Sequence, residues 1–150
     1  MPEDIYNFLL LTETLLSSGM PTAGQLADIS KSGVELVINL ALPTSERALS
    51  NEAELVTSLG MKYIGIPVEW EKPTRQNLEN FMIAMDANID KKILVHCQAN
   101  YRATGFITLY RILRLGWNRD DAFKDLHRIW NPDEYPIWKK FIEDNLIKNP

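Results

Sequence analysis

A short apolar strand, a polar turn and an almost entirely apolar helix follow one another between residues 93 and 115. Ile93-Leu94-Val95 is an apolar run of strand length, and the stretch from about Ala103 to Leu115 places apolar residues on nearly every side of a helix. Gly116 ends that helix. A strand and a helix that are both apolar all round must be covered by other elements, so we expect them at the centre of a layered α/β domain.

The remainder of the chain alternates between apolar runs of strand length and stretches that open with a helix-capping residue. The expected strands cover Leu15–Ser18, Val34–Leu40 and Met61–Val68. The expected helices begin near Thr22, Asn51, Thr74, Asn118 and Asp133. This alternation predicts an α/β fold with a central, mainly parallel sheet flanked by helices.

The length of 150 residues is enough for one domain with a sizeable core, so we expect residues 1–150 to form a single unit. Sixteen basic and twenty acidic residues give a net charge of -4, which argues against binding to nucleic acid or anionic membranes by bulk electrostatics. The apolar runs are too short for a membrane span, and no signal peptide is recognisable. We therefore expect a cytoplasmic protein, or a periplasmic one if a leader was removed.

The sequence contains one cysteine, Cys97, and two histidines that lie far apart. A single cysteine excludes an internal disulfide and a thiolate-based zinc site, and the separation of the histidines disfavours other metal centres. We therefore expect no metal and no cofactor. The lone thiol needs an explanation of its own.

The apolar strand runs straight into His96 and Cys97, at the position where open α/β sheets bind ligands. Backbone N–H groups of a turn that leads into a helix form an anion-binding concavity. The positive field of the helix N-terminus and the guanidinium of Arg102 both favour the thiolate form of a cysteine. Arg102 can also hold two oxygens of a phosphate or similar oxyanion while the sulfur attacks its central atom. The segment therefore predicts a nucleophile in an oxyanion pocket.

Val95-His96-Cys97, a short loop and Arg102 resemble the signature of the protein tyrosine phosphatase superfamily. The wider frame, in which Tyr63–Val68, a charged loop and a helix precede the signature, resembles the dual-specificity branch and related bacterial phosphatase-like domains of uncharacterised function. The resemblance extends from roughly Leu15 to Leu115. It implies a tyrosine-phosphatase-like fold, a phosphocysteine intermediate, and a phosphorylated small molecule or phosphoprotein as substrate.

The loop departs from this family in several ways. Four residues separate Cys97 from Arg102, one fewer than in the phosphatases, and this spacing is more typical of rhodanese-like sulfurtransferases. The related bacterial phosphatase-like domains of uncharacterised function resemble this sequence in the short spacing as well. The loop lacks glycine, and we expect Asn100 to adopt the left-handed backbone conformation instead. Ala103 stands where the family has Ser or Thr beside the arginine. Thr104 follows one position later, where it could still reach Cys97.

The family takes its general acid from an Asp in the loop before the signature, and here that loop offers Glu69 and Glu71 instead. We expect one of them to protonate the leaving oxygen as the loop closes over the pocket with Trp70 between them. Glu69 is slightly preferred because it follows the strand more closely. Without the signature, both glutamates would be interpreted as part of an ordinary solvated loop.

The candidate catalytic residues are Cys97, Arg102, Glu69 and Glu71. The candidate substrate-binding residues form the turn and its flanks: His96, Gln98, Ala99, Asn100, Tyr101, Ala103 and Thr104. Among these, His96 is expected to be a buried support of the loop backbone rather than a proton shuttle. We expect the downstream aromatic residues to anchor the terminal helices to the core rather than line the site: Trp130, Tyr135 and Trp138.

Three functions remain open from the sequence. The first is hydrolysis of a phosphomonoester or phosphotyrosine through a phosphocysteine on Cys97. The second is rhodanese-like sulfur transfer through a Cys97 persulfide. The third is a non-catalytic module that binds a phosphate ligand or a partner. The oligomeric state does not follow from the sequence.

Overall fold

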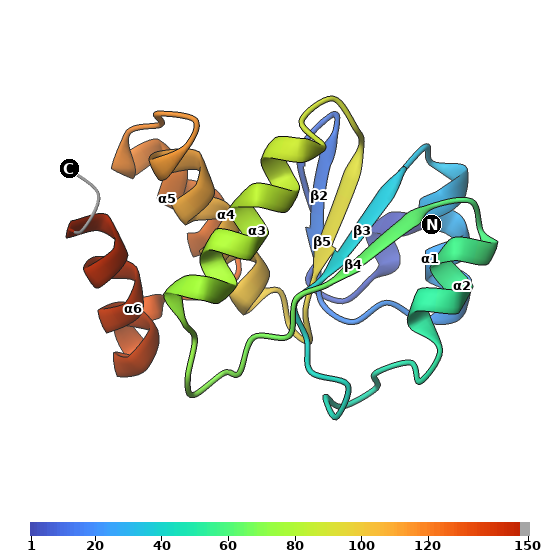
Figure 1. The fold of residues 1–150 in the computed structure, drawn as a ribbon, viewed down its shortest axis with the longest axis horizontal. Coiled ribbons are helices and arrows are strands. Elements are labelled where there is room, and N and C mark those ends of the chain that lie inside the picture. The colour runs from blue at the N-terminus through green and yellow to red at the C-terminus, as the bar shows by residue number, and fades with distance from the viewer. Residues whose placement is uncertain (148–150) are drawn as a thin grey trace.

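Five strands form one sheet, in the order β1-β2-β5-β3-β4, in the computed structural model of the chain, which describes residues 1–147 (Figure 1). The strands are Leu9–Thr12 (β1), Leu15–Ser18 (β2), Leu36–Asn39 (β3), Lys62–Gly65 (β4) and Ile93–His96 (β5). β1 pairs antiparallel with β2, and the other neighbours pair parallel. The predicted mainly parallel sheet is therefore confirmed.

Strand β5 lies in the middle of the sheet, between β2 and β3, and all of its residues are buried. The register places Ser18 of β2 and Asn39 of β3 on either side of His96. The carboxyl ends of three parallel strands thus meet at one edge of the sheet. The turn that starts with Cys97 leaves β5 at this edge, where α/β sheets bind their ligands.

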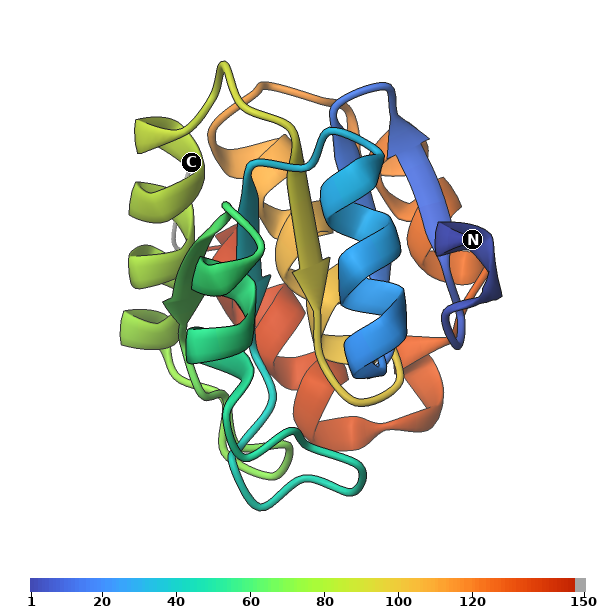
Figure 2. The ribbon, with the colours of Figure 1, turned by 90° about the vertical axis from the view of Figure 1, so that its right-hand side faces the viewer.

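Helices cover both faces of the sheet. The α-helices are Ala23–Lys31 (α1), Glu52–Ser58 (α2), Arg75–Ala87 (α3), Tyr101–Leu113 (α4), Arg119–His127 (α5) and Pro136–Ile147 (α6), and short 3-10 helices span Pro2–Asp4 (η1) and Pro132–Glu134 (η2). Helices α1 and α2 cover one face and α3 and α4 the other (Figure 1 and Figure 2). Helices α5 and α6 pack on α4, so they form an outer layer. Among residues 1–147, no helix has the length and apolar character needed to cross a membrane.

Local sequence signals set several helix boundaries. Thr22 and Gln25 form a capping box at the start of α1, and Thr74 and Asn77 form another at the start of α3. Gly33 follows α1 with a φ of 96°, a conformation that a side chain would disfavour. The starts of α1 and α3 agree with the prediction, because each depends on residues that are close in sequence.

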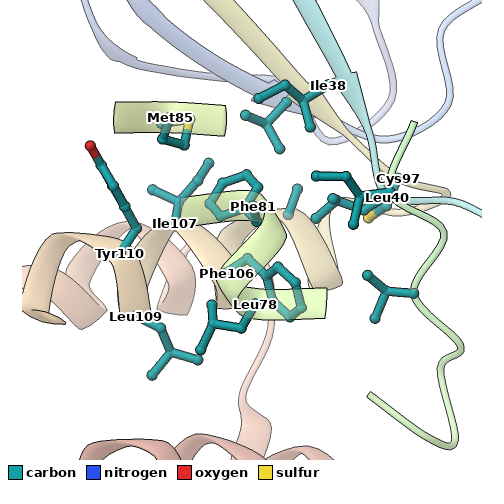
Figure 3. Close-up of a cluster of buried hydrophobic side chains, with 14 of the residues drawn as sticks. Ile38, Leu40, Leu78, Phe81, Met85, Cys97, Phe106, Ile107, Leu109 and Tyr110 are labelled. Carbon is teal, nitrogen blue, oxygen red and sulfur yellow. The ribbon is translucent and has the colours of Figure 1, made fainter. Parts of the chain in front are cut away.

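Two clusters of buried apolar side chains lie on the two faces of the sheet. Alternate residues of β5 face opposite sides, so Leu94 joins the cluster under α1 and α2 while Val95 joins the cluster under α3 and α4. Figure 3 shows the second cluster, in which Phe81 of α3 meets Phe106 of α4 with 5.6 Å between ring centroids. This packing fixes α4, and with it the turn that leads into α4.

The structure differs from the prediction at several boundaries. The edge strand β1 is absent from the prediction, because Leu9 is its one buried residue and the strand shows no regular alternation. Helix α4 begins at Tyr101 rather than Ala103, since the left-handed Asn100 directly precedes it. Asp133 does not cap the last helix: it lies within η2, and α6 begins only at Pro136.

Candidate active site

Side-chain hydrogen bonds fix the turn between β5 and α4. Asn100 has φ 69° and ψ 8°, which is the left-handed conformation expected for it. Its Nδ2 donates to the carbonyl oxygen of Asn7 (2.8 Å) and to Ser17 Oγ (3.0 Å). In return, Asn7 Nδ2 donates to the carbonyl oxygen of Ala99 (3.0 Å). One side chain therefore sets the backbone of the turn and ties it to β2 and to the N-terminal segment.

The carbonyl groups of the turn are engaged, whereas several of its amides are free. Met20 N–H donates to the carbonyl oxygen of Gln98 over 3.0 Å. Within residues 1–147, the backbone amides of Gln98, Ala99 and Tyr101 donate no hydrogen bond. Free N–H groups at the start of a helix attract anions because they carry the positive end of the helix dipole. The turn therefore offers the donors that an oxyanion needs.

Arg102 lies in the first turn of α4 and is only 6% exposed. Its Nη1 donates to the carbonyl oxygen of Val68 over 2.8 Å. No carboxylate of the described residues lies within 4.0 Å of its guanidinium, whereas the similarly buried Arg111 pairs with Asp125 at 2.8 Å. A buried charge without a counter-ion is costly. The positive charge of Arg102 is thus uncompensated and available to an anionic ligand.

Cys97 and Arg102 line the same cavity, which has a volume of about 410 Å³. Its other lining residues come from the turn and from two aromatic segments: Trp70, Gln98, Ala99, Tyr101 and Tyr135. The side chain of Cys97 is nevertheless fully buried, and Figure 3 shows its sulfur beside Leu40 at the edge of the hydrophobic cluster. Reaction of the thiol with a substrate therefore requires that a lining group moves.

Aromatic side chains form the walls of the cavity. Tyr101 stacks on Trp130 with 4.9 Å between ring centroids, and Trp138 Nε1 donates to the carbonyl oxygen of Trp70 over 2.7 Å. Tyr135 lines the cavity itself, which differs from its expected role as an anchor of the terminal helices. Burial, and next the adjacent Tyr135 hydroxyl, raise the pKa of Tyr101, which keeps its phenol protonated. Sequence reasoning missed Tyr135 because tertiary packing alone brings it to the turn.

Glu69 and Glu71 are exposed and are not among the residues that line the cavity. The backbone on either side of Glu69 is held in place, because the carbonyl oxygens of Val68 and Trp70 accept hydrogen bonds from Arg102 and Trp138. Trp70, which lies between them in the chain, lines the cavity. In this arrangement the loop supplies an aromatic wall, while its carboxylates point into solvent.

The flanks of the turn are buried and support it. His96 is fully buried; its Nε2 lies 2.6 Å from Glu52 Oε2, and its Nδ1 lies 3.3 Å from the carbonyl oxygen of Cys97. Ala103 packs in the core. The Thr104 hydroxyl donates to the carbonyl oxygen of Asn100 (2.7 Å), so it braces the turn rather than reaching Cys97. Within residues 1–147, no three His, Cys, Asp or Glu side chains are grouped to hold a metal ion.

Comparison with known proteins gives relatives among solved structures alone: no family model matches the chain, and no curated protein matches it. A DUF442 protein from Shewanella putrefaciens CN-32, described as a candidate phosphatase, is 37% identical, with a TM-score of 0.86 over 97% of this chain and 92% of that chain. A second crystal structure of that protein gives a TM-score of 0.88 at the same 37% identity, over 98% of this chain and 95% of that chain.

More distant neighbours share the fold. TpbA from P. aeruginosa, crystallised in complex with pTyr, is 16% identical with a TM-score of 0.73, over 95% of this chain and 85% of that chain. The core catalytic domain of the PP-IP phosphatase SIW14 from S. cerevisiae is 18% identical with a TM-score of 0.74, over 96% of this chain and 90% of that chain. The chain therefore belongs to the DUF442 family and has the fold of the protein tyrosine phosphatase superfamily.

Proposed function

We propose that the chain is a cysteine-dependent phosphatase that hydrolyses phosphate monoesters through a phosphocysteine on Cys97. One observation carries this proposal: the buried guanidinium of Arg102, which has no carboxylate partner among residues 1–147, lines the cavity that Cys97 also lines. The free amides of the turn add further donors. Positive charge and fixed N–H groups stabilise a phosphoryl group most effectively where water is largely excluded.

In the proposed reaction, the thiolate of Cys97 attacks phosphorus, so that an S–P bond forms as the ester P–O bond breaks. Arg102 and the amides of the turn hold the non-bridging oxygens as charge redistributes among them. A water molecule then attacks the phosphorus and gives a proton to the carboxylate that was deprotonated in the first step, and the S–P bond breaks. This second step regenerates the thiolate and releases inorganic phosphate.

The leaving oxygen takes its proton from Glu69 or Glu71 in this proposal. Both carboxylates flank Trp70, which lines the cavity, so a small movement of this loop would bring one of them toward the leaving group. Glu69 is slightly preferred because it follows the end of β4 more closely than Glu71 does. A carboxylic acid in this role contributes about 10²–10⁴-fold to the rate for poor leaving groups.

The walls of the cavity support an aromatic phosphate as the substrate. Trp70, Tyr101 and Tyr135 can pack against a ring, while Arg102 is the one basic side chain among the described residues that line the cavity. A single cation suits one phosphoryl group better than a highly phosphorylated molecule. The substrate is therefore a phosphotyrosine-containing protein or a small aryl phosphate.

Sulfur transfer through a Cys97 persulfide is a second candidate, which the four-residue spacing between Cys97 and Arg102 favours. A non-catalytic module that binds a phosphate ligand or partner is a third, which the full burial of the thiol favours. Both alternatives use the same turn and the same arginine, so assays must distinguish them.

Release of phosphate from p-nitrophenyl phosphate and from a phosphotyrosine peptide tests the proposal. We expect turnover by the wild type and a loss of at least about 10³-fold in both Cys97→Ser and Arg102→Lys. The exposed Arg114→Lys serves as the matched control and should retain activity. Thiocyanate formed from thiosulfate and cyanide would instead support sulfur transfer. Phosphate binding with neither activity would support the binding module.

A further inference from the structure

A buried acid–histidine pair lies behind the proposed nucleophile. His96 is fully buried, Glu52 is 4% exposed, and 2.6 Å separates His96 Nε2 from Glu52 Oε2. Glu52 belongs to the first turn of α2, far from Cys97 in the sequence, and the proposed reaction does not use it. A glutamate is rarely buried to this extent unless it is paired, because burial of an unpaired charge is costly.

The partners of the imidazole indicate its protonation. Its Nδ1 lies 3.3 Å from the carbonyl oxygen of Cys97, which can only accept, so Nδ1 carries a hydrogen. Its Nε2 faces the carboxylate of Glu52. Within residues 1–147, no Lys or Arg lies within 4.0 Å of Glu52, so His96 is the group that can balance its charge. An ionised Glu52 therefore requires that both ring nitrogens of His96 be protonated.

The surroundings of Glu52 agree with a negative charge. Asn39 Nδ2 lies 3.5 Å from Glu52 Oε1 and donates to the hydroxyl oxygen of Tyr63 over 3.1 Å. The titratable groups that contact this network are Glu52 from α2, Tyr63 from β4 and Cys97, which follows His96 in the chain.

We infer that Glu52 is a positioning residue that holds His96 as an imidazolium and, through it, stabilises the thiolate of Cys97. This inference rests on the proposed role of Cys97 as the nucleophile. The imidazolium N–H donates to the Cys97 carbonyl oxygen, which polarises the Cys97–Gln98 peptide and makes the free N–H of Gln98 more positive. Without the carboxylate, His96 loses its counter-ion and becomes neutral, so the positive charge nearest to Cys97 disappears and the thiolate is disfavoured.

A titration of the thiolate tests this inference directly. The chain has a single cysteine, so the ultraviolet absorbance of its thiolate, measured against Cys97→Ser as the blank, reports Cys97 alone. We expect Glu52→Gln, which keeps the shape and can still hydrogen-bond, to move the titration midpoint upward by about one pH unit, a tenfold loss of thiolate below it. Glu54→Gln, an exposed change on the same helix, is the matched control and should leave the midpoint unchanged. An unchanged midpoint in a folded Glu52→Gln protein overturns the inference.

A second measurement leaves Glu52 unchanged, so it tests the inference even if the Glu52→Gln protein does not fold. The sequence has two histidines, and nitrogen-15 NMR of histidine-labelled protein resolves His96 once His127→Gln assigns the other. We expect both ring nitrogens of His96 to be protonated at neutral pH. A neutral ring with a bare Nε2 overturns the inference. Neither readout depends on phosphate release, so a protein without phosphatase activity contradicts the proposed function but not this role of Glu52.

Discussion

The guanidinium of Arg102 and the carbonyl oxygen of Val68 are joined by a hydrogen bond of 2.8 Å. This bond connects the first turn of α4 to the loop that carries Trp70. Arg102 and Trp70 both line the cavity, so the bond joins two of its lining segments. It occupies one N–H of the guanidinium, and within residues 1–147 the other N–H groups have no partner, so they can bind an anion. A backbone carbonyl also orients the arginine without neutralising its charge.

Replacement of Arg102 should stabilise the protein while it removes anion binding. Arg102→Met keeps most of the packing and removes a buried charge that has no carboxylate partner in residues 1–147, so we expect an increase of about 1–3 kcal/mol in the free energy of unfolding without ligand. Phosphate or vanadate should raise the Tm of the wild type but not of the variant. Arg114→Met, at an exposed pair with Asp86, is the control. A marked destabilisation of Arg102→Met would mean that the arginine is structural.

The proposed acid can be identified from the leaving group. No carboxylate is among the described residues that line the cavity, and in the proposed reaction Glu69 or Glu71 supplies the proton when the loop moves. We expect Glu69→Gln, or else Glu71→Gln, to slow hydrolysis of phenyl phosphate by about 10²-fold or more. Hydrolysis of p-nitrophenyl phosphate should change little, because that leaving group needs no proton. If both variants hydrolyse both substrates at the wild-type rate, neither glutamate is the general acid.

Two substitutions at Asn100 separate its backbone role from its side-chain role. Asn100→Gly permits the left-handed φ of 69° but loses the bonds to Asn7 and Ser17, so we expect a destabilisation of about 1–2 kcal/mol. The loss is limited because Asn100 Oδ1 is buried without a partner and its burial penalty disappears as well. Asn100→Ala should cost about 1 kcal/mol more, since alanine is strained in this conformation. Urea denaturation would measure both, and equal losses would contradict the backbone role.

Tyr110 predicts a loss of stability in alkali. Burial, and next its hydrogen bond to Asp86, raise the pKa of Tyr110 to about 12. In the unfolded chain the same phenol ionises at about pH 10. The contribution of Tyr110 to the free energy of unfolding is therefore complete below that pH and is lost as the pH rises through about 12. Figure 3 shows the hydroxyl of Tyr110 pointing away from the cluster, where Phe can replace it. Denaturant titrations should show a smaller decline between these pH values in Tyr110→Phe. An identical decline in both proteins would contradict this assignment.

Much of the fold could be predicted because its signals are local. The apolar run of β5 followed directly by Cys97 places a turn at the carboxyl edge of the sheet, and the capping box of Thr22 and Gln25 marks the start of α1. The left-handed conformation of Asn100 also follows from local preference, since the turn has no glycine. Each of these features depends on residues within a few positions of one another.

The remaining features depend on contacts between distant segments. Glu52 meets His96 because the parallel pairing of β3 and β5 brings the helix after β3 over the end of β5. Tyr135 reaches the cavity because η2 and α6 pack back toward α4. Periodicity and capping report whether a residue lies in a helix or strand, but not which residue of another element it meets. The carboxylate beside His96 and one wall of the cavity are therefore visible only in the folded chain.

Mass spectrometry of the protein, quenched during turnover of p-nitrophenyl phosphate, shows whether Cys97 carries the phosphoryl group. We predict one phosphoryl group on the peptide that contains Cys97, with neither the adduct nor phosphate release in Cys97→Ser. Phosphate release at the wild-type rate by Cys97→Ser, or a phosphoryl group on another residue, would mean that Cys97 is not the nucleophile.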